Sequence, residues 1–263
     1  MTATSITANP LRPEWDDYQV RLIENTSLGP HHRLRLEAPG LAGRLKPGQF
    51  INLSVPGHLL RRPLAVAWQD EKAIELIVTP FGLGTRKLAR LPAGTPLMAL
   101  GPLGNGFPEP EGDLAIVSAG AGVAALLLLA QNALKQGRRV HVFHGAVSNE
   151  DAELMAVTYQ RTGLKAGYFS EDGALGRRGL PTDGLRELLA SGAAVTVYSV
   201  GPYSMMRAAA LLALEYEQPG YVSLDVHMAC GVGSCRSCAV LIQEGQKYAC
   251  VDGPVFAAGE VAW

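Results

Sequence analysis

Apolar and polar positions alternate along the first part of the chain. Residues 15–105 contain six such runs, separated by Gly, Pro and Asp: YQVRLIE, HRLRLEA, GQFINLSV, LAVAWQ, AIELIVT and PLMALG. A period of two is typical of strands that bury one face. We therefore expect a small antiparallel barrel in this region.

From Asp113 the pattern changes to apolar runs followed by Ala- and Leu-rich runs. LAIVSAG is followed by VAALLLLAQNALKQG, and AVTVYSVGP by YSMMRAAALLALEYE. This alternation predicts a parallel sheet with helices. Near the C-terminus, the runs at 239–242 and 247–250 predict a hairpin with its turn at Glu244 and Gly245. We expect three domains, at residues 1–108, 109–222 and 223–263.

Charge and hydropathy exclude two classes of partner. The chain has 23 Lys and Arg against 24 Asp and Glu, so it has no basic field to attract nucleic acid. Its longest apolar run covers residues 119–130, whereas a membrane-spanning helix needs about 20 residues. The first 17 residues lack the charged start and apolar stretch of a signal peptide, so we expect a cytoplasmic protein, with no nucleic acid or membrane as partner.

All four cysteines lie in residues 230–250, with the spacing C-x4-C-x2-C-x11-C. This is the plant-type pattern of a [2Fe–2S] cluster. Gly231, Gly233 and Ser234 leave the loop backbone free to curl and to direct N–H groups at the sulfurs. The alternatives are a structural zinc site, which usually takes paired C-x2-C knuckles, and two disulfides, which conflict with a reducing compartment. The candidate cluster ligands are Cys230, Cys235, Cys238 and Cys250.

A glycine turn follows a predicted strand in SAGAGVAAL. Gly120, Gly122 and Ala125 form G-x-G-x-x-A at the start of a helix, where free N–H groups can bind a pyrophosphate. An ordinary strand-to-helix turn is the alternative. In a dinucleotide-binding domain an acid at the end of the next strand holds the ribose, but here Glu150 and Asp151 lie several residues past that strand. No Arg or Lys lies between Gly145 and Asp151 to pair with a 2′-phosphate, which favours NAD over NADP. A second loop, at Gly201 and Pro202, follows the strand VTVYSV and is the expected second wall of this site.

Two stretches of the barrel region carry candidate anion-binding groups. LLRRPLAV places Arg61 and Arg62 before a proline, where a guanidinium can hold a phosphate bidentately; a solvated basic pair is the alternative. VTPFGLGTRKLARL places Gly82, Gly84 and Thr85 just before a short helix, whose N-terminus suits an anion; simple helix capping is the alternative.

The motifs RRPLAV, FGLGT, LGPLGNGF, SAGAGVAAL, VGPYSMMRA, MACGVGSCRSC and CVDGPVF occur together in this order. Over residues 18–261 the chain resembles the electron-transfer subunit of the two-subunit, NAD-linked dihydroorotate dehydrogenase, in the ferredoxin-reductase superfamily. The resemblance implies an FAD-binding barrel, a nicotinamide-binding α/β domain and a C-terminal [2Fe–2S] module. It also implies that all four cysteines are cluster ligands.

The resemblance also assigns flavin contacts. The family motif R-P-x-S falls on residues 62–65, with Ala65 in place of Ser, so a hydroxyl contact to the flavin is missing; Ala125 likewise replaces a common Pro. A neutral hydrogen bond contributes only about 0.5–1.5 kcal/mol, so these departures affect affinity more than function. The implied FAD-binding residues are Arg62, Pro63, Leu64, Ala65, Ile77, Val78, Thr79, Gly84 and Thr85.

The function that the resemblance implies is electron transfer in pyrimidine (UMP) biosynthesis. Electrons pass singly from an FMN-containing catalytic subunit through the cluster to FAD, and as hydride from FAD to NAD+, in a heterotetramer of two copies of each subunit. No catalytic residue is expected in this chain, since no thiol remains to act as a base. The alternatives are an NAD(P)H-dependent flavin/iron–sulfur reductase serving another redox partner, although oxygenase reductases have a longer gap before the fourth cysteine, and a non-catalytic iron–sulfur redox sensor.

Overall fold

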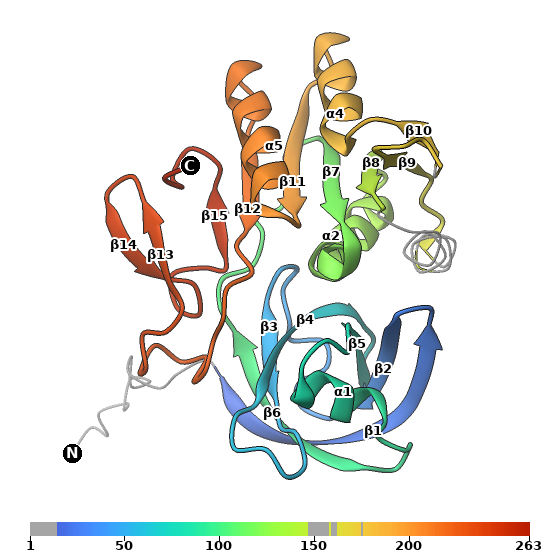
Figure 1. Cartoon of the computed structure of the whole chain (residues 1–263), viewed down its shortest axis with the longest axis vertical. Helices are drawn as coiled ribbons and strands as arrows, with labels where there is room; N and C mark the ends of the chain where they lie inside the picture. The colour runs from blue at the N-terminus through green and yellow to red at the C-terminus, as the bar shows by residue number, and fades with distance from the viewer. Residues whose placement is uncertain (1–14, 147–157, 159–161, 175) are drawn as a thin grey trace, which may run out of the picture.

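The computed structural model describes residues 15–146, 158, 162–174 and 176–263. Three parts are visible in Figure 1: a barrel, an α/β domain above it, and a C-terminal hairpin and loops at the side of both. Glu150, Asp151 and most of the stretch that favours NAD over NADP lie outside the described residues. Among the residues that the structure describes, no helix combines the length and apolar character that a membrane span needs.

Six antiparallel strands close into a barrel in the order β1-β2-β5-β4-β3-β6, which confirms the expected architecture. The alternation seen in the sequence fills its interior: Val20 and Leu22 of β1 are buried, whereas Arg21 between them is exposed. The elements are β1 (Asp16–Leu28), β2 (His31–Glu37), β3 (Phe50–Leu53), β4 (Arg62–Gln69), β5 (Ala73–Val78), α1 (Leu83–Ala89) and β6 (Pro96–Leu103).

The α/β domain is built on a seven-stranded sheet in the order β10-β9-β8-β7-β11-β12-β15. Neighbouring strands pair in parallel except at the β12–β15 edge, which is antiparallel. Its elements are β7 (Asp113–Ala119), the 3-10 turn η1 (Gly120–Val123), α2 (Ala124–Lys135), β8 (Val140–Gly145), β9 (Ala166–Ser170), β10 (Arg177–Arg178), α4 (Pro181–Ala190), β11 (Val195–Val200), α5 (Tyr203–Glu215), β12 (Gly220–Ser223) and β15 (Val255–Ala257).

Helices cover both faces of this sheet. Leu114 and Ile116 of β7 belong to the apolar cluster that contains α2, whereas Ala115 and Val117 belong to the cluster on the other face with residues of α4 and α5. The helix α2 is apolar on almost all sides because it lies between the sheet and the barrel (Figure 1). The barrel residue Ala67 packs into the same cluster as α2, so the two domains share apolar contacts.

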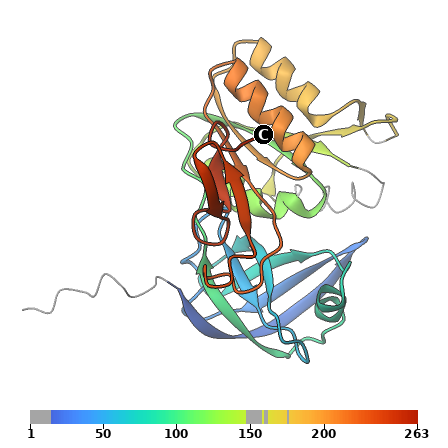
Figure 2. The same cartoon turned by 60° about the vertical axis from the view of Figure 1, so that its left-hand side comes forward.

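The C-terminal part contains the expected hairpin, made of β13 (Ala239–Ile242) and β14 (Gly245–Tyr248). The second strand begins two residues earlier than predicted, because Gly245, with φ of 124°, already pairs with Ile242. Cys250 therefore lies in the turn after β14 rather than in the strand. Figure 2 shows this part lying against both the barrel and the α/β domain, and its apolar cluster includes Phe50 from the barrel and Met206 from α5.

Candidate functional site

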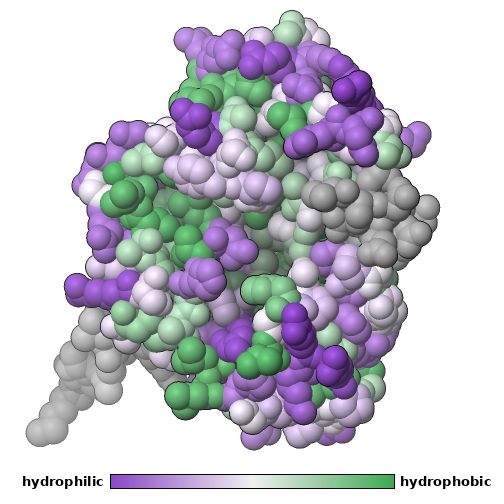
Figure 3. Space-filling model, in the orientation of Figure 1, coloured by the Kyte–Doolittle hydropathy of each residue, from purple (hydrophilic) through white to green (hydrophobic). Residues whose placement is uncertain are grey.

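A cleft of about 610 Å³ lies where the three parts of the molecule meet. The space-filling view shows this face hollowed between the barrel and the α/β domain (Figure 3). Strand β4 and the start of α1 line one side, the turn after β7 lines another, and residues 223–228, which lead to the first cysteine, line a third. The segments expected to bind flavin and nicotinamide thus meet at one cavity with the segment that leads to the cysteine loop.

The predicted flavin residues surround this cleft with one exception. Val78 is 1% exposed and belongs to the barrel core, because it points to the opposite side of β5 from Ile77. The hydroxyl of Thr79, just after β5, lies 2.8 Å from Nδ1 of the buried His31, which fixes its position. The predicted residues that line the cleft are Arg62, Pro63, Leu64, Ala65, Ile77, Thr79, Gly84 and Thr85.

The two adjacent arginines have different environments. Arg61 forms a bidentate ion pair with Asp17, at 2.6 and 2.8 Å, and this pair raises its pKa. Arg62 donates from Nη1 to the carbonyl oxygens of Leu60 and Arg61, at 2.7 and 3.1 Å, and its guanidinium lies against Gly84. The arginine that the flavin motif predicts is therefore held by backbone groups at the wall of the cleft.

The helix α1 begins at Leu83, whereas the sequence predicted Gly84 and Thr85 to lie just before it, so both residues are in its first turn. The N–H of Gly82 donates to the hydroxyl of Thr85 at 3.1 Å, and that hydroxyl donates to the carbonyl of Gly82 at 3.2 Å. Both bonds stabilise the start of the helix. Helix capping, the alternative from the sequence, thus accounts for the Thr85 hydroxyl, while Thr85 still lines the cleft.

The residues that the sequence predicted to bind nicotinamide lie at two strand ends. Val200 of β11 pairs with Ser118 of β7, so the turns that follow these parallel strands lie side by side. Gly122 lines the cleft, and a Cβ there would be 3.2 Å from Cγ1 and the carbonyl oxygen of Val200. Gly120 has φ of 53°, which favours glycine. Gly201 lies against the backbone of the β7 turn, and Pro202 caps α5.

The four cysteines are brought to one loop and the turn beside it. Sγ of Cys238 lies 3.3 Å from Sγ of Cys250. Backbone N–H groups point at sulfur: those of Val232 and Cys235 at Cys230, at 3.5 and 3.4 Å, and that of Gly233 at Cys250, at 3.2 Å. This is the N–H arrangement that the sequence predicted for a thiolate cluster.

The chemistry of these thiols also fits a cluster. The Ser237 hydroxyl and then backbone N–H groups lower the pKa of Cys235 to about 6, whereas burial raises the pKa of Cys250 to about 12. A buried thiol of this kind is deprotonated when it coordinates a metal. Within the described part of the chain, no three His, Cys, Asp or Glu side chains converge on a single-ion position; a [2Fe–2S] cluster divides its four thiolates between two irons.

Sequence reasoning missed a carboxylate in the cleft. Asp225 lies two residues past the end of β12 and lines the cavity, as does His227. Enclosure raises the pKa of Asp225, and the nearby His227 opposes the rise. Only its place directly after a strand, at the edge where open sheets bind ligands, could have pointed to it.

Comparison with known proteins agrees with this geometry. Residues 225–262 match the family model of the iron-sulfur cluster binding domain of dihydroorotate dehydrogenase B. The electron transfer subunit of dihydroorotate dehydrogenase B (NAD(+)) from Shouchella clausii (strain KSM-K16) is 34% identical over 246 residues, which cover 88% of this chain and 92% of that protein. The chain belongs to this family of electron-transfer subunits. The subunit of the same name from Bacillus caldolyticus is 36% identical over 244 residues, covering 84% of this chain and 90% of its own.

Solved structures share the fold of this electron-transfer subunit. A chain of an NADH-dependent reduced ferredoxin-NADP oxidoreductase, studied for flavin-based electron bifurcation, matches with a TM-score of 0.81 and 26% identity, over 92% of this chain and 89% of its own. The ferredoxin reductase of carbazole 1,9a-dioxygenase matches 80% of this chain and 68% of its own with a TM-score of 0.66 and 18% identity. The expected ferredoxin-reductase-like architecture is confirmed.

Proposed function

We propose that this chain carries electrons between the catalytic subunit of dihydroorotate dehydrogenase and NAD+, in pyrimidine biosynthesis. It is an oxidoreductase component whose cofactors are FAD, a [2Fe–2S] cluster and NAD. Its relatives are named as electron transfer subunits, which implies a separate catalytic subunit. We further propose that this partner holds FMN and that two copies of each subunit assemble.

One observation carries the proposal: three segments line a single cleft. They are the flavin strand β4, the turn after β7, where nicotinamide is expected, and residues 223–228, which precede the cluster loop. Met228, at the end of that lining, is two residues from Cys230. A bound flavin exchanges hydride with a nicotinamide and single electrons with a cluster. The residues of this chain would hold the nicotinamide and the cluster next to the same cavity and exclude water from it.

The proposed roles follow the three parts of the chain. Residues 1–108 bind FAD, with Arg62 as the phosphate-binding cation; residues 109–222 bind NAD at Gly120, Gly122, Gly201 and Pro202; residues 223–263 bind the cluster. The antiparallel pairing of β15 with β12 means that the last part also completes the sheet of the second. The free thiols are compatible with the reducing conditions of the cytoplasm, where we place the protein.

Co-expression with an FMN-containing catalytic subunit tests the proposal. The purified complex should contain FAD, FMN and iron, and should reduce NAD+ with dihydroorotate. The chain alone should show bleaching of its flavin by NADH and no turnover of dihydroorotate. Turnover by the chain alone would overturn this division of labour.

The same experiment separates the alternatives. Failure to form a complex, with NADH still bleaching the flavin, would favour a reductase serving another redox partner, as the likeness to an NADH-dependent ferredoxin-NADP oxidoreductase also suggests. A protein that carries flavin and iron without bleaching by NADH would favour a redox sensor.

A further inference from the structure

A buried amide of the barrel contacts the cluster loop. Asn52 on β3 is 1% exposed, and its Nδ2 donates to the carbonyl oxygen of Cys230 at 3.2 Å, with the carbonyl of Ala229 at 3.5 Å. Cys230 is the first cysteine of the cluster motif. The side chain thus joins two segments that are 178 positions apart in the chain.

The strand that carries Asn52 is the direct neighbour of the flavin strand. Asn52 is in register with Pro63 on β4, and the next pair along is Leu53 with Arg62. Figures 1 and 2 show the C-terminal segment lying beside this side of the barrel. The side chain of Asn52 therefore connects β3, the strand next to the flavin strand β4, with the backbone of the predicted cluster ligand Cys230.

The loop backbone packs tightly on this amide. Gly231 has φ of 75°, and a Cβ there would lie 3.1 Å from Nδ2 of Asn52 and 3.3 Å from Cδ1 of Leu103. The Oδ1 of Asn52 is buried and has no hydrogen-bond partner among the described residues. An unpaired buried acceptor is destabilising, so packing alone would be served better by a leucine of similar size. What the amide adds is the bond to Cys230.

We propose that Asn52 is a positioning residue for electron transfer: its amide holds the Cys230 end of the cluster loop against β3, the neighbour of the flavin strand β4, and so sets the separation of FAD and cluster. This inference rests on the proposed function. Transfer between two centres slows as the gap between them widens, and hydrogen bonding around the ligands tunes the cluster. Asn52 acts through Cys230 and not by contact with either cofactor.

The test uses the full chain with FAD and cluster bound, without the catalytic subunit. Asn52→Leu removes the donor and keeps the volume. NADH should bleach the flavin of the variant at the wild-type rate, while the following reduction of the cluster slows by about two- to tenfold, the range that one net hydrogen bond represents. The EPR spectrum and midpoint potential of the dithionite-reduced cluster should also shift.

Asn105→Leu is the matched control. Asn105 also joins the end of the barrel to the C-terminal part, since its Nδ2 donates to the carbonyl of Asp252 at 2.8 Å. This variant should keep the wild-type rate, spectrum and potential. Equal slowing in both variants would mean a general loosening of the C-terminal part and would overturn the proposal, as would an unchanged Asn52→Leu.

If Asn52→Leu fails to hold iron, Asn52→Ser answers the question, because it leaves a small donor that cannot span the same gap. Iron retention with a slowed cluster step supports the proposal, and a wild-type cluster step contradicts it. Because dihydroorotate and the partner subunit are absent, failure of the dihydroorotate assay does not affect this result. A wild-type chain whose cluster is never reduced by NADH would count against the proposed function instead.

Discussion

The guanidinium of Arg62 occupies the space that a side chain on Gly84 would need. A Cβ built on Gly84 would stand 2.5 Å from Cζ of Arg62, in a wall of the cleft. The strand β4 and the first turn of α1 are therefore in contact through an arginine and a glycine. The pair couples two motifs that are separate in the sequence.

Gly84→Ala should weaken FAD binding and leave the fold intact. The new methyl group meets the flexible end of Arg62, which can move away, but the guanidinium then leaves its place at the cleft. Loss of a hydrogen bond to a charged group costs about 1.5–3 kcal/mol, or roughly ten- to a hundredfold in affinity for FAD. Flavin content and a titration of the apoprotein with FAD measure the change.

Gly112→Ala controls for loss of a glycine, because nothing lies within 4 Å of a Cβ at that position. It should bind FAD as the wild type does. Unchanged FAD affinity in Gly84→Ala would show that Arg62 does not contact the cofactor from this position.

Gly201→Ala should act on the nicotinamide step alone. Its φ is 156°, and a Cβ would stand 2.7 Å from Cε of Met205 and 3.2 Å from the backbone nitrogen of Ala119. The added methyl group displaces the loop beside the β7 turn, which costs about 1 kcal/mol of strain. The KM for NADH should therefore rise roughly fivefold. Stopped-flow bleaching of the flavin at several NADH concentrations gives the KM, and normal FAD content serves as the internal control. A raised KM together with lost flavin would place the damage in the barrel instead.

Cys250→Ser should remove the cluster and preserve the flavin reaction. The sulfur of Cys250 is 3.3 Å from that of Cys238 and accepts the N–H of Gly233, so its loss leaves the site one thiolate short. The cleft is lined by other residues, so NADH should still bleach the flavin. Iron analysis and EPR should show no reduced cluster. Iron bound with an unchanged EPR signal would exclude Cys250 as a ligand.

The regular parts of the fold could be predicted from the sequence because their patterns are local. Each barrel strand buries one face, so alternation reveals it, and the Leu- and Ala-rich run of α2 reflects burial between two layers. β15 has three residues and pairs with a strand over 30 positions away. No local pattern carries that information.

The site was predictable where a motif fixes the chemistry, and less so where tertiary contacts decide. The cysteine spacing led to the loop in which backbone N–H groups point at sulfur. The motif predicts Ile77, Val78 and Thr79 together as flavin contacts, but successive residues of a strand face opposite sides, so Val78 points into the barrel. Asn52 and Asp225 are single polar residues in or after apolar strands, and only the packing of distant segments brings Asn52 to Cys230 and Asp225 into the cleft.

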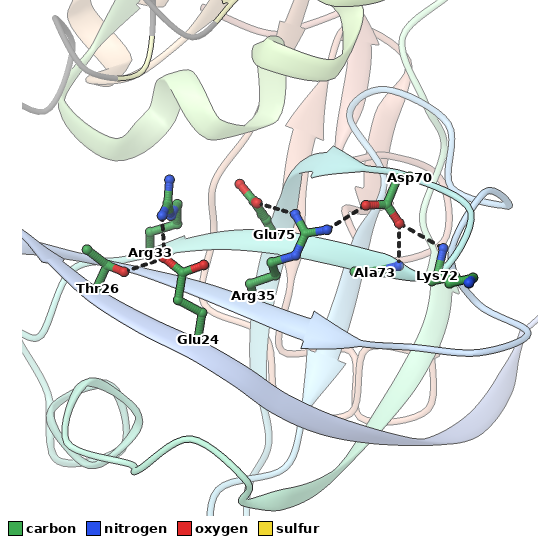
Figure 4. Close-up of polar contacts among 8 residues, drawn as sticks. All are labelled: Glu24, Thr26, Arg33, Arg35, Asp70, Lys72, Ala73 and Glu75. Atoms are coloured by element: carbon green, nitrogen blue, oxygen red, sulfur yellow. Dashed lines mark hydrogen bonds and ion pairs between the residues drawn. The ribbon is translucent and has the colours of Figure 1, made fainter.

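Asp70 should make part of the stability of the barrel depend on pH. Figure 4 shows Arg35 between two carboxylates, at 2.6 Å from Asp70 and 2.7 Å from the buried Glu75. The backbone N–H of Lys72 first, and then that of Ala73 and the Arg35 guanidinium, hold the pKa of Asp70 below its ordinary value. A carboxylate with a lowered pKa in the folded state stabilises that state above its unfolded pKa, and this contribution is lost as the pH falls through the folded value.

Asp70→Asn should therefore lower the Tm at neutral pH, by an amount that shrinks as the pH falls from about 4, the ordinary pKa of the unfolded state, through the lower pKa of the folded state. The asparagine can still accept a bond in the turn, so the difference reports charge. Glu71→Gln is the matched control, since Glu71 is exposed and forms no ion pair with any described residue. Its Tm should follow the wild type at every pH. A Tm difference for Asp70→Asn that is constant from neutral pH to pH 3 would show that the charge of Asp70 contributes nothing beyond the turn.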